Sequence, residues 1–159
     1  MTRKRSAYRP RPVIADPLSM LRPAPKADRD RVMGQFLSSL QTMVAGSHPG
    51  EAEWRDLSDA INTTETLALH LHKLDALEVM PTVNAAIAAI VRAANRFKAG
   101  QGMRLDAAGL QSLRDVLAIY EQCLEGLTER EMAQAQAETQ RRMHALLRSK
   151  KPSAQVIAL

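Results

Sequence analysis

The side chains that could do chemistry in this chain are few, and their spacing suits no common site. His70 and His72 are two positions apart, which on a helix places them on different faces. Two histidines on one helix can share a metal when they are four positions apart, and His48 and His144 have no ligand-type neighbours at that spacing. We therefore interpret the histidines as solvated or packed side chains, and the sequence predicts no metal site.

The single cysteine, Cys123, is predicted to be structural. Glu121 and Glu125 lie close to it, and acidic neighbours raise the pKa of a thiol, which weakens it as a nucleophile. On helices the carboxylates that could form acid–base pairs are most simply a solvated face: Asp56, Asp59, Glu65, Glu121 and Glu125. The segment Gly100-Gln101-Gly102 lacks the Lys-Ser/Thr and the preceding strand of a phosphate-binding loop. The sequence therefore predicts neither an enzyme nor a bound cofactor.

The element around which the rest of the chain is predicted to pack is the segment 82–97. Its apolar residues recur at helical spacing and form one stripe: Val83, Ala86, Ile87, Ile90, Val91, Ala94 and Phe97. Additional alanines widen this stripe, so neighbouring helices could approach from more than one side. Because aromatic residues make up only 3% of the chain, the core must be built from aliphatic side chains and methionine, which suits helices better than sheets.

Helix signals continue on both sides of this segment. Pro81 is placed to start the central helix after a short connection or a ragged helix end at residues 75–80, and Gly100 and Gly102 suit its left-handed end. Asn62-Thr63-Thr64 interrupts the stripe of the preceding helix and predicts a bend or a polar contact inside the bundle. The other predicted helices cover about residues 30–45, 49–74, 106–126 and 128–149.

The boundary between the last two predicted helices is left open by the sequence. Thr128 and Glu131 have the spacing of a capping box that would start a new helix. The last helix could instead continue from the fourth with only a kink. In either case the expected fold is all-α, a bundle of four to five helices over residues 28–150.

Positive charge is concentrated at the two ends of the chain. The net charge is +5, but residues 1–26 hold seven basic residues against one acidic residue, and residues 141–151 hold five basic residues and no acidic one. Five of the eight prolines also fall before residue 27, so residues 1–27 are expected to form a flexible, disordered basic arm. Residues 151–159 are expected to be a frayed tail. The body between the two basic ends is mildly acidic, which confines any nucleic-acid argument to the ends.

No segment is predicted to cross a membrane. The longest apolar run, residues 85–91, is seven residues long, whereas a span needs roughly 20. The basic N-terminus is not followed by an apolar stretch, so it is not interpreted as a secretory signal. A lone cysteine gives no argument for an oxidising compartment. We therefore expect a soluble cytoplasmic protein.

The last predicted helix carries the main functional hypothesis. Its stripe is too apolar for free solvent and too polar for a core. We therefore expect a non-enzymatic interaction or regulatory module whose last helix binds another protein or forms a homo-oligomer. The residues expected to make this contact are Met132, Thr139, Met143, Leu146 and Leu147. The alternative is that both basic ends bind nucleic acid through its phosphates. The residues for this alternative are Arg3, Lys4, Arg5, Arg9, Arg11, Arg141, Arg142, Arg148, Lys150 and Lys151.

Residues 127–133 are similar to the opening of many helix-turn-helix motifs. The following residues, 134–139, contain no turn glycine and begin no second apolar-patterned helix. A plain capped helix is therefore the preferred interpretation of this segment.

Three features stand out in residues 103–147: a Met-Arg-Leu-Asp start, a Leu-Arg-Asp sequence followed by Tyr120, and an Arg-Arg-Met-His sequence near the end. In these features the stretch resembles small uncharacterised helical accessory proteins of proteobacterial phages and plasmids. The resemblance implies an accessory protein of a mobile genetic element, whose compartment would be the host cytoplasm. It implies no reaction and no functional residues.

Overall fold

The computed structural model describes residues 18–46 and 48–148, and this part of the chain is helical with no strand. It contains a short 3-10 helix and five α-helices: η1 (Ser19–Leu21), α1 (Lys26–Ala45), α2 (Glu51–Leu69), α3 (Ala76–Lys98), α4 (Ala107–Gly126) and α5 (Glu129–Arg148). The predicted all-α bundle is confirmed. The predicted arm lies outside the described residues up to position 17, and the predicted frayed tail lies entirely outside them.

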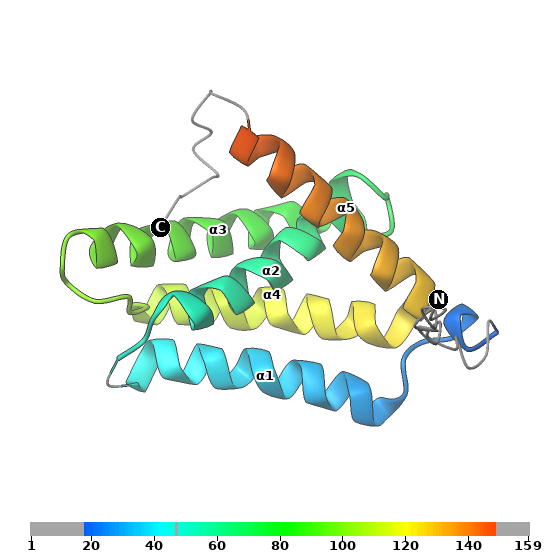
Figure 1. The fold of residues 1–159 in the computed structure, drawn as a ribbon, viewed down its shortest axis with the longest axis horizontal. Coiled ribbons are helices and arrows are strands. Elements are labelled where there is room, and N and C mark those ends of the chain that lie inside the picture. Colours follow the sequence, from blue (N-terminus) through cyan, green and yellow to red (C-terminus); the bar gives the residue numbers. More distant parts are fainter. Residues whose placement is uncertain (1–17, 47, 149–159) are drawn as a thin grey trace, which may run out of the picture.

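Helices α1 to α4 form the bundle, and α5 is added to one side of it (Figure 1). In this view α1, α4 and α3 run side by side, while α2 crosses them obliquely and packs against all three. Helix α5 diverges from this direction and lies against α2 and η1. Helix α5 therefore has a less enclosed position than the other helices, although Met132 and Ala135 in its first half belong to the core.

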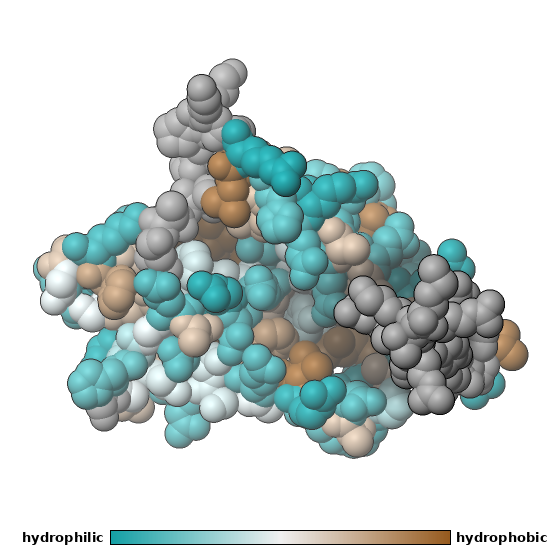
Figure 2. All heavy atoms as spheres, viewed as in Figure 1, coloured by the Kyte–Doolittle hydropathy of each residue, from teal (hydrophilic) through white to brown (hydrophobic). Residues whose placement is uncertain are grey.

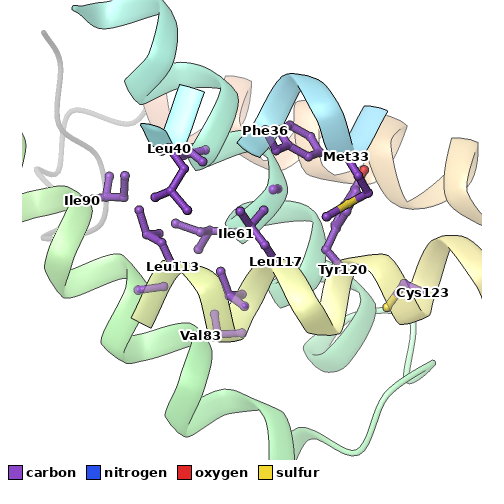
Figure 3. Packing of buried hydrophobic residues seen from close by; sticks show 14 of the residues in the cluster. Met33, Phe36, Leu40, Ile61, Val83, Ile90, Leu113, Leu117, Tyr120 and Cys123 are labelled. Atoms are coloured by element: carbon purple, nitrogen blue, oxygen red, sulfur yellow. The ribbon is translucent and has the colours of Figure 1, made fainter. Parts of the chain in front are cut away.

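The core between α1 and α4 is aliphatic, with a single aromatic pair at one end. The rings of Phe36 and Tyr120 meet edge to face, with centroids 5.3 Å apart and planes at 86°. Side chains from all four helices of the bundle point toward one another in Figure 3, among them Leu40, Ile61, Val83, Ile90, Leu113 and Leu117. The stripe of the central helix thus forms part of the core, but Ile87 and Val91 are only half-buried and Phe97 is 39% exposed in the last turn of α3.

The start of the central helix differs from the prediction. Helix α3 begins at Ala76, where the Asp75 side chain accepts a hydrogen bond from the Leu77 amide at 2.9 Å. Pro81 lies inside the second turn of α3 rather than at its start. Its ring nitrogen has no hydrogen to donate to the Leu77 carbonyl, so α3 lacks one backbone hydrogen bond at this position. Residues 76–80 are therefore helix and not a connection.

The preceding helix also ends earlier than predicted, at Leu69 instead of about residue 74. His72 adopts a left-handed conformation with φ of 50°, and the Lys73 amide donates to the Leu67 carbonyl at 2.8 Å, so the chain turns away from the helix axis. Leu71 and Leu74 still pack against the core, but from the connection. Because Leu71 and Leu74 continue the apolar spacing of α2, the sequence wrongly predicted that the helix extends to them.

The remaining boundaries agree better with the sequence. Helix α1 starts four residues before the predicted position, directly after Pro25, whose fixed φ suits a helix start. The Asp106 side chain accepts from the Gly109 amide at 2.7 Å and caps α4 as predicted. Thr128 and Glu131 form the reciprocal hydrogen bonds of a capping box. Helices α4 and α5 are therefore separate, which settles the question left open by the sequence.

Among the described residues, α3 alone is long and apolar enough to span a membrane by length and composition. The same test is passed by the core helices of soluble proteins, and α3 contributes Val83, Ala86 and Ala93 to the core with no exposed surface. This finding is compatible with a soluble protein.

Candidate protein-binding groove

Helix α5 is anchored to the rest of the protein mainly through its N-terminal half. The Glu129 amide donates to the Arg22 carbonyl at 2.9 Å, and Lys73 bridges to Glu131 with 2.6 Å between nitrogen and carboxylate oxygen. Met132 and Ala135 are buried and join the core cluster. The hydrogen bond from Lys73, followed by those of the capping box with Thr128, lowers the pKa of Glu131 to about 2.

Farther along, α5 crosses α2 through a polar contact. The Thr139 hydroxyl donates to the Thr66 hydroxyl oxygen at 2.8 Å, and Arg142 donates to the same oxygen at 2.9 Å. Arg142 also donates to Glu65 at 3.2 Å, where the side chain of Glu65 is 9% exposed. Helix α2 continues unbroken through Asn62-Thr63-Thr64, and the predicted polar contact is present there, because the Asn62 carbonyl oxygen lies 3.5 Å from the Thr139 hydroxyl; the contact at Thr66 extends it by one turn. These buried polar groups fix where α5 rests on α2 because each needs its partner.

Beyond this crossing, a groove of about 540 Å³ opens between α2, α3 and α5. We call it the α5 groove. Each helix lines it with apolar side chains at helical spacing: Trp54 and Ile61 from α2, Ile87 and Val91 from α3, and Met143 and Leu147 from α5. Leu147 is 60% exposed. In Figure 2 apolar atoms come to the surface beside the C-terminal end of α5, next to mainly hydrophilic atoms.

Trp54 stiffens the floor of the α5 groove. Its indole Nε1 donates to the Ile90 carbonyl at 3.2 Å, which ties α2 to α3 across the groove. The ring has an apolar body and a satisfied polar edge, a combination that is common in binding surfaces. Glu51, Arg55 and Asp59 add charged groups to the lining. The groove thus combines apolar walls with charged groups from α2.

A second, more polar recess of about 310 Å³ adjoins the groove, and Asp59, Thr139 and Gln140 line both. Burial, together with the charge of Asp56, raises the pKa of Asp59. Asp56 itself accepts a hydrogen bond from the Ser39 hydroxyl at 2.8 Å. The structure therefore brings Asp56 and Asp59 together, two of the five candidate carboxylates. The other residues that line the recess have amide, hydroxyl or phenol side chains, apart from Phe36.

The structure divides the five residues predicted to bind a partner. Met132 and Thr139 are buried against the bundle, so their side chains do not face a partner. Met143 and Leu146 are half-buried, and Leu147 is exposed. Only Thr139, Met143 and Leu147 line the groove. The sequence did not identify the walls on α2 and α3, because Trp54, Ile87 and Val91 have the same helical spacing as the core residues.

The ten basic residues of the nucleic-acid alternative are also separated. Arg3, Lys4, Arg5, Arg9, Arg11, Lys150 and Lys151 lie outside the described residues. Arg141 is exposed and pairs with Glu138, whereas Arg142 is half-buried and bonded to Glu65 and Thr66. Arg148 is exposed at the end of α5. Within the described part of the chain, the end of α5 therefore offers fewer unpaired positive charges than the sequence implied.

Several other sequence interpretations need correction. His70 and His72 are not on a helix, because α2 ends before them. Glu65 is not on a solvated face but is buried beside Arg142. Cys123 is buried, and this burial, rather than its acidic neighbours, raises the pKa of its thiol to about 11. Within residues 18–46 and 48–148 no three metal-ligating side chains gather into a site.

Helix α5 is a single helix of 20 residues, so residues 127–139 form no helix-turn-helix. No protein-family model, curated protein or solved structure matches this chain.

Proposed function

We propose that this protein is a non-enzymatic protein-binding module and that its α5 groove takes an amphipathic helix of another protein. The supporting observation is that three helices direct apolar side chains into one open groove, with Leu147 on its α5 wall 60% exposed. Open apolar surface with polar neighbours is typical of interaction sites. A helix laid in such a groove would bury this surface with anchors at helical spacing.

The dimensions of the groove suit this partner. Its lining on α2 extends from Glu51 to Asn62, which at about 1.5 Å per residue is roughly 16 Å, or three helical turns. Three turns present about three or four anchoring side chains, the usual number in helix-in-groove recognition. Self-association through α5 is a form of the same proposal, in which a second copy supplies the helix. We further propose a cytoplasmic accessory role in a mobile genetic element, on the resemblance of residues 103–147.

Differential capture tests the proposed function. The full chain with Leu147→Glu and the full chain with Leu77→Glu are used as baits in a lysate and the captured proteins are identified by mass spectrometry. Both leucines are exposed, at 60% and 90%, so both variants are expected to fold, but only Leu147 lines the groove. We expect wild type and Leu77→Glu to capture a partner that Leu147→Glu loses. Identical capture by all three proteins would contradict the proposal, and light scattering would report self-association in the same way.

Nucleic-acid binding remains the second proposal. Arg141 and Arg148 are exposed on the last turns of α5, and they could act with the basic ends of the chain. Neutralising Arg3, Lys4, Arg5, Arg9 and Arg11 should then abolish salt-dependent binding to random DNA or RNA. Absence of binding at low salt would exclude this alternative.

A further inference from the structure

We propose that the C-terminal segment of this same chain, residues 151–159, binds in the α5 groove and competes there with the partner helix. The competition rests on the proposed function, but the contact between segment and groove does not. Three observations support the contact: the place where the described part of α5 ends, the length of chain that follows, and the match in chemistry between the two.

The chain enters this segment at the edge of the groove. Leu147 lines the α5 groove, and Arg148 is the last residue of α5. Val156 follows eight residues later, so it can lie up to about 26–29 Å from Arg148. The groove is roughly 16 Å long along α2. Residues 151–159 can therefore reach any part of it, and Pro152 favours a change of direction because it disfavours helix at the residue before it.

The composition of the segment fits the lining. Val156, Ile157, Ala158 and Leu159 are four consecutive apolar residues, which match the apolar walls formed by α3 and α5. The basic pair Lys150 and Lys151 precedes them, and in the lining of the groove the two carboxylates of Glu51 and Asp59 outnumber the one guanidinium, that of Arg55. Both the apolar and the charged groups of the segment thus have counterparts in the groove.

Attachment to α5 makes even a weak contact effective. A connection of only a few residues holds the segment at an effective concentration on the order of 1 mM. If a separate peptide of residues 151–159 binds with a Kd of about 0.1 mM, the attached segment fills the groove about 90% of the time. An outside helix would then bind about tenfold more weakly to the intact chain than to a chain with a free groove.

Trp54, which is the single tryptophan of the chain and lines the groove, provides the readout. We compare full-length wild type with full-length Val156→Asp/Ile157→Asp, and use Ser153→Asp/Gln155→Asp as a control that adds the same charge without removing apolar groups. We expect red-shifted Trp54 emission in the first variant alone. A fluorescein-labelled peptide of residues 151–159 should bind that variant about tenfold more tightly than it binds wild type or the control.

Blocking the groove completes the test. Adding Leu147→Glu to the Val156→Asp/Ile157→Asp chain should abolish binding of the peptide. The proposal is overturned if the peptide does not bind the unblocked variant, if it binds the blocked one equally well, or if Trp54 emission is the same in all full-length proteins. These outcomes concern only the segment: the differential capture at Leu147 can succeed while the peptide fails, and the reverse is equally possible, so the two proposals are tested separately.

Discussion

The polar contact between α5 and α2 gives an asymmetric prediction about two charged partners. Arg142 donates to Glu65 at 3.2 Å and to Thr66 at 2.9 Å. The side chain of Glu65 is 9% exposed, whereas that of Arg142 is 24% exposed. Replacing Arg142 with Met therefore leaves a carboxylate in a nearly buried position without its cation, while replacing Glu65 leaves a cation that can turn toward water. We expect Arg142→Met to be the more destabilising change.

The magnitudes follow from these exposures. Breaking a fully buried ion pair costs about 3–5 kcal/mol, and because Arg142 keeps about a quarter of its surface in water we expect about 2–3 kcal/mol for Arg142→Met. Glu65→Gln keeps an oxygen that can accept from Arg142, so we expect about 1 kcal/mol. The double variant Glu65→Met/Arg142→Met buries no unpaired charge and should be more stable than Arg142→Met alone by about 1 kcal/mol or more.

Urea unfolding followed by circular dichroism measures these free energies for the four proteins. Hydrogen exchange at the Thr139 amide shows in addition whether α5 opens locally before the bundle unfolds, as its one-sided packing suggests. The reasoning would be refuted if Arg142→Met changed the free energy of unfolding by less than about 0.5 kcal/mol, or if it were no more costly than Glu65→Gln.

Three further predictions test the local structure. Gly34→Ala should stabilise the protein by about 0.5–1 kcal/mol, because Gly34 lies in the middle of α1 and an added Cβ meets no atom within 4 Å. Gly102→Ala should instead destabilise it by about 1 kcal/mol, because the φ of Gly102 is +82°. Urea unfolding measures both changes in the free energy of unfolding. Asp106→Ala removes the cap of α4 and should cost about 1 kcal/mol in the same assay, with Asp106→Asn close to wild type. The lowered pKa of Glu131 means that its stabilising contribution is present above its ordinary value of 4.5 and is lost as pH falls toward about 2. Wild type should therefore lose about 1 kcal/mol relative to Glu131→Gln between pH 6 and pH 2, and equal acid sensitivity of the two proteins would contradict this.

The sequence predicted local structure well where a short-range signal specifies it. The stripe around Val83 and Ile90 predicted the central helix, and the Thr128 and Glu131 spacing predicted the start of α5. Such signals depend on residues within one or two helical turns. The prediction was wrong where a core contact imitated helical spacing, as with Leu71 and Leu74, which pack against the core from a connection.

The candidate site could be predicted only in part for a related reason. The mixed apolar and polar stripe of α5 directed attention to this helix, but the sequence could not distinguish Met132 and Thr139, which face the bundle, from Leu147, which remains exposed. Nor could it distinguish Ile87 and Val91 in the groove wall from the core residues of the same stripe. A side chain becomes core or surface according to which other helix covers it.

The sequence by itself determined that this protein is helical, where most of its helices begin and end, and that its core is aliphatic. Only the tertiary structure decided that α5 crosses α2 at Thr66 and Glu65, and that it leaves an open groove above Trp54. The physical reason is that helix formation depends on neighbours along the chain, whereas a groove depends on the angle at which distant helices meet. That angle is fixed here by buried polar contacts between residues more than 70 positions apart.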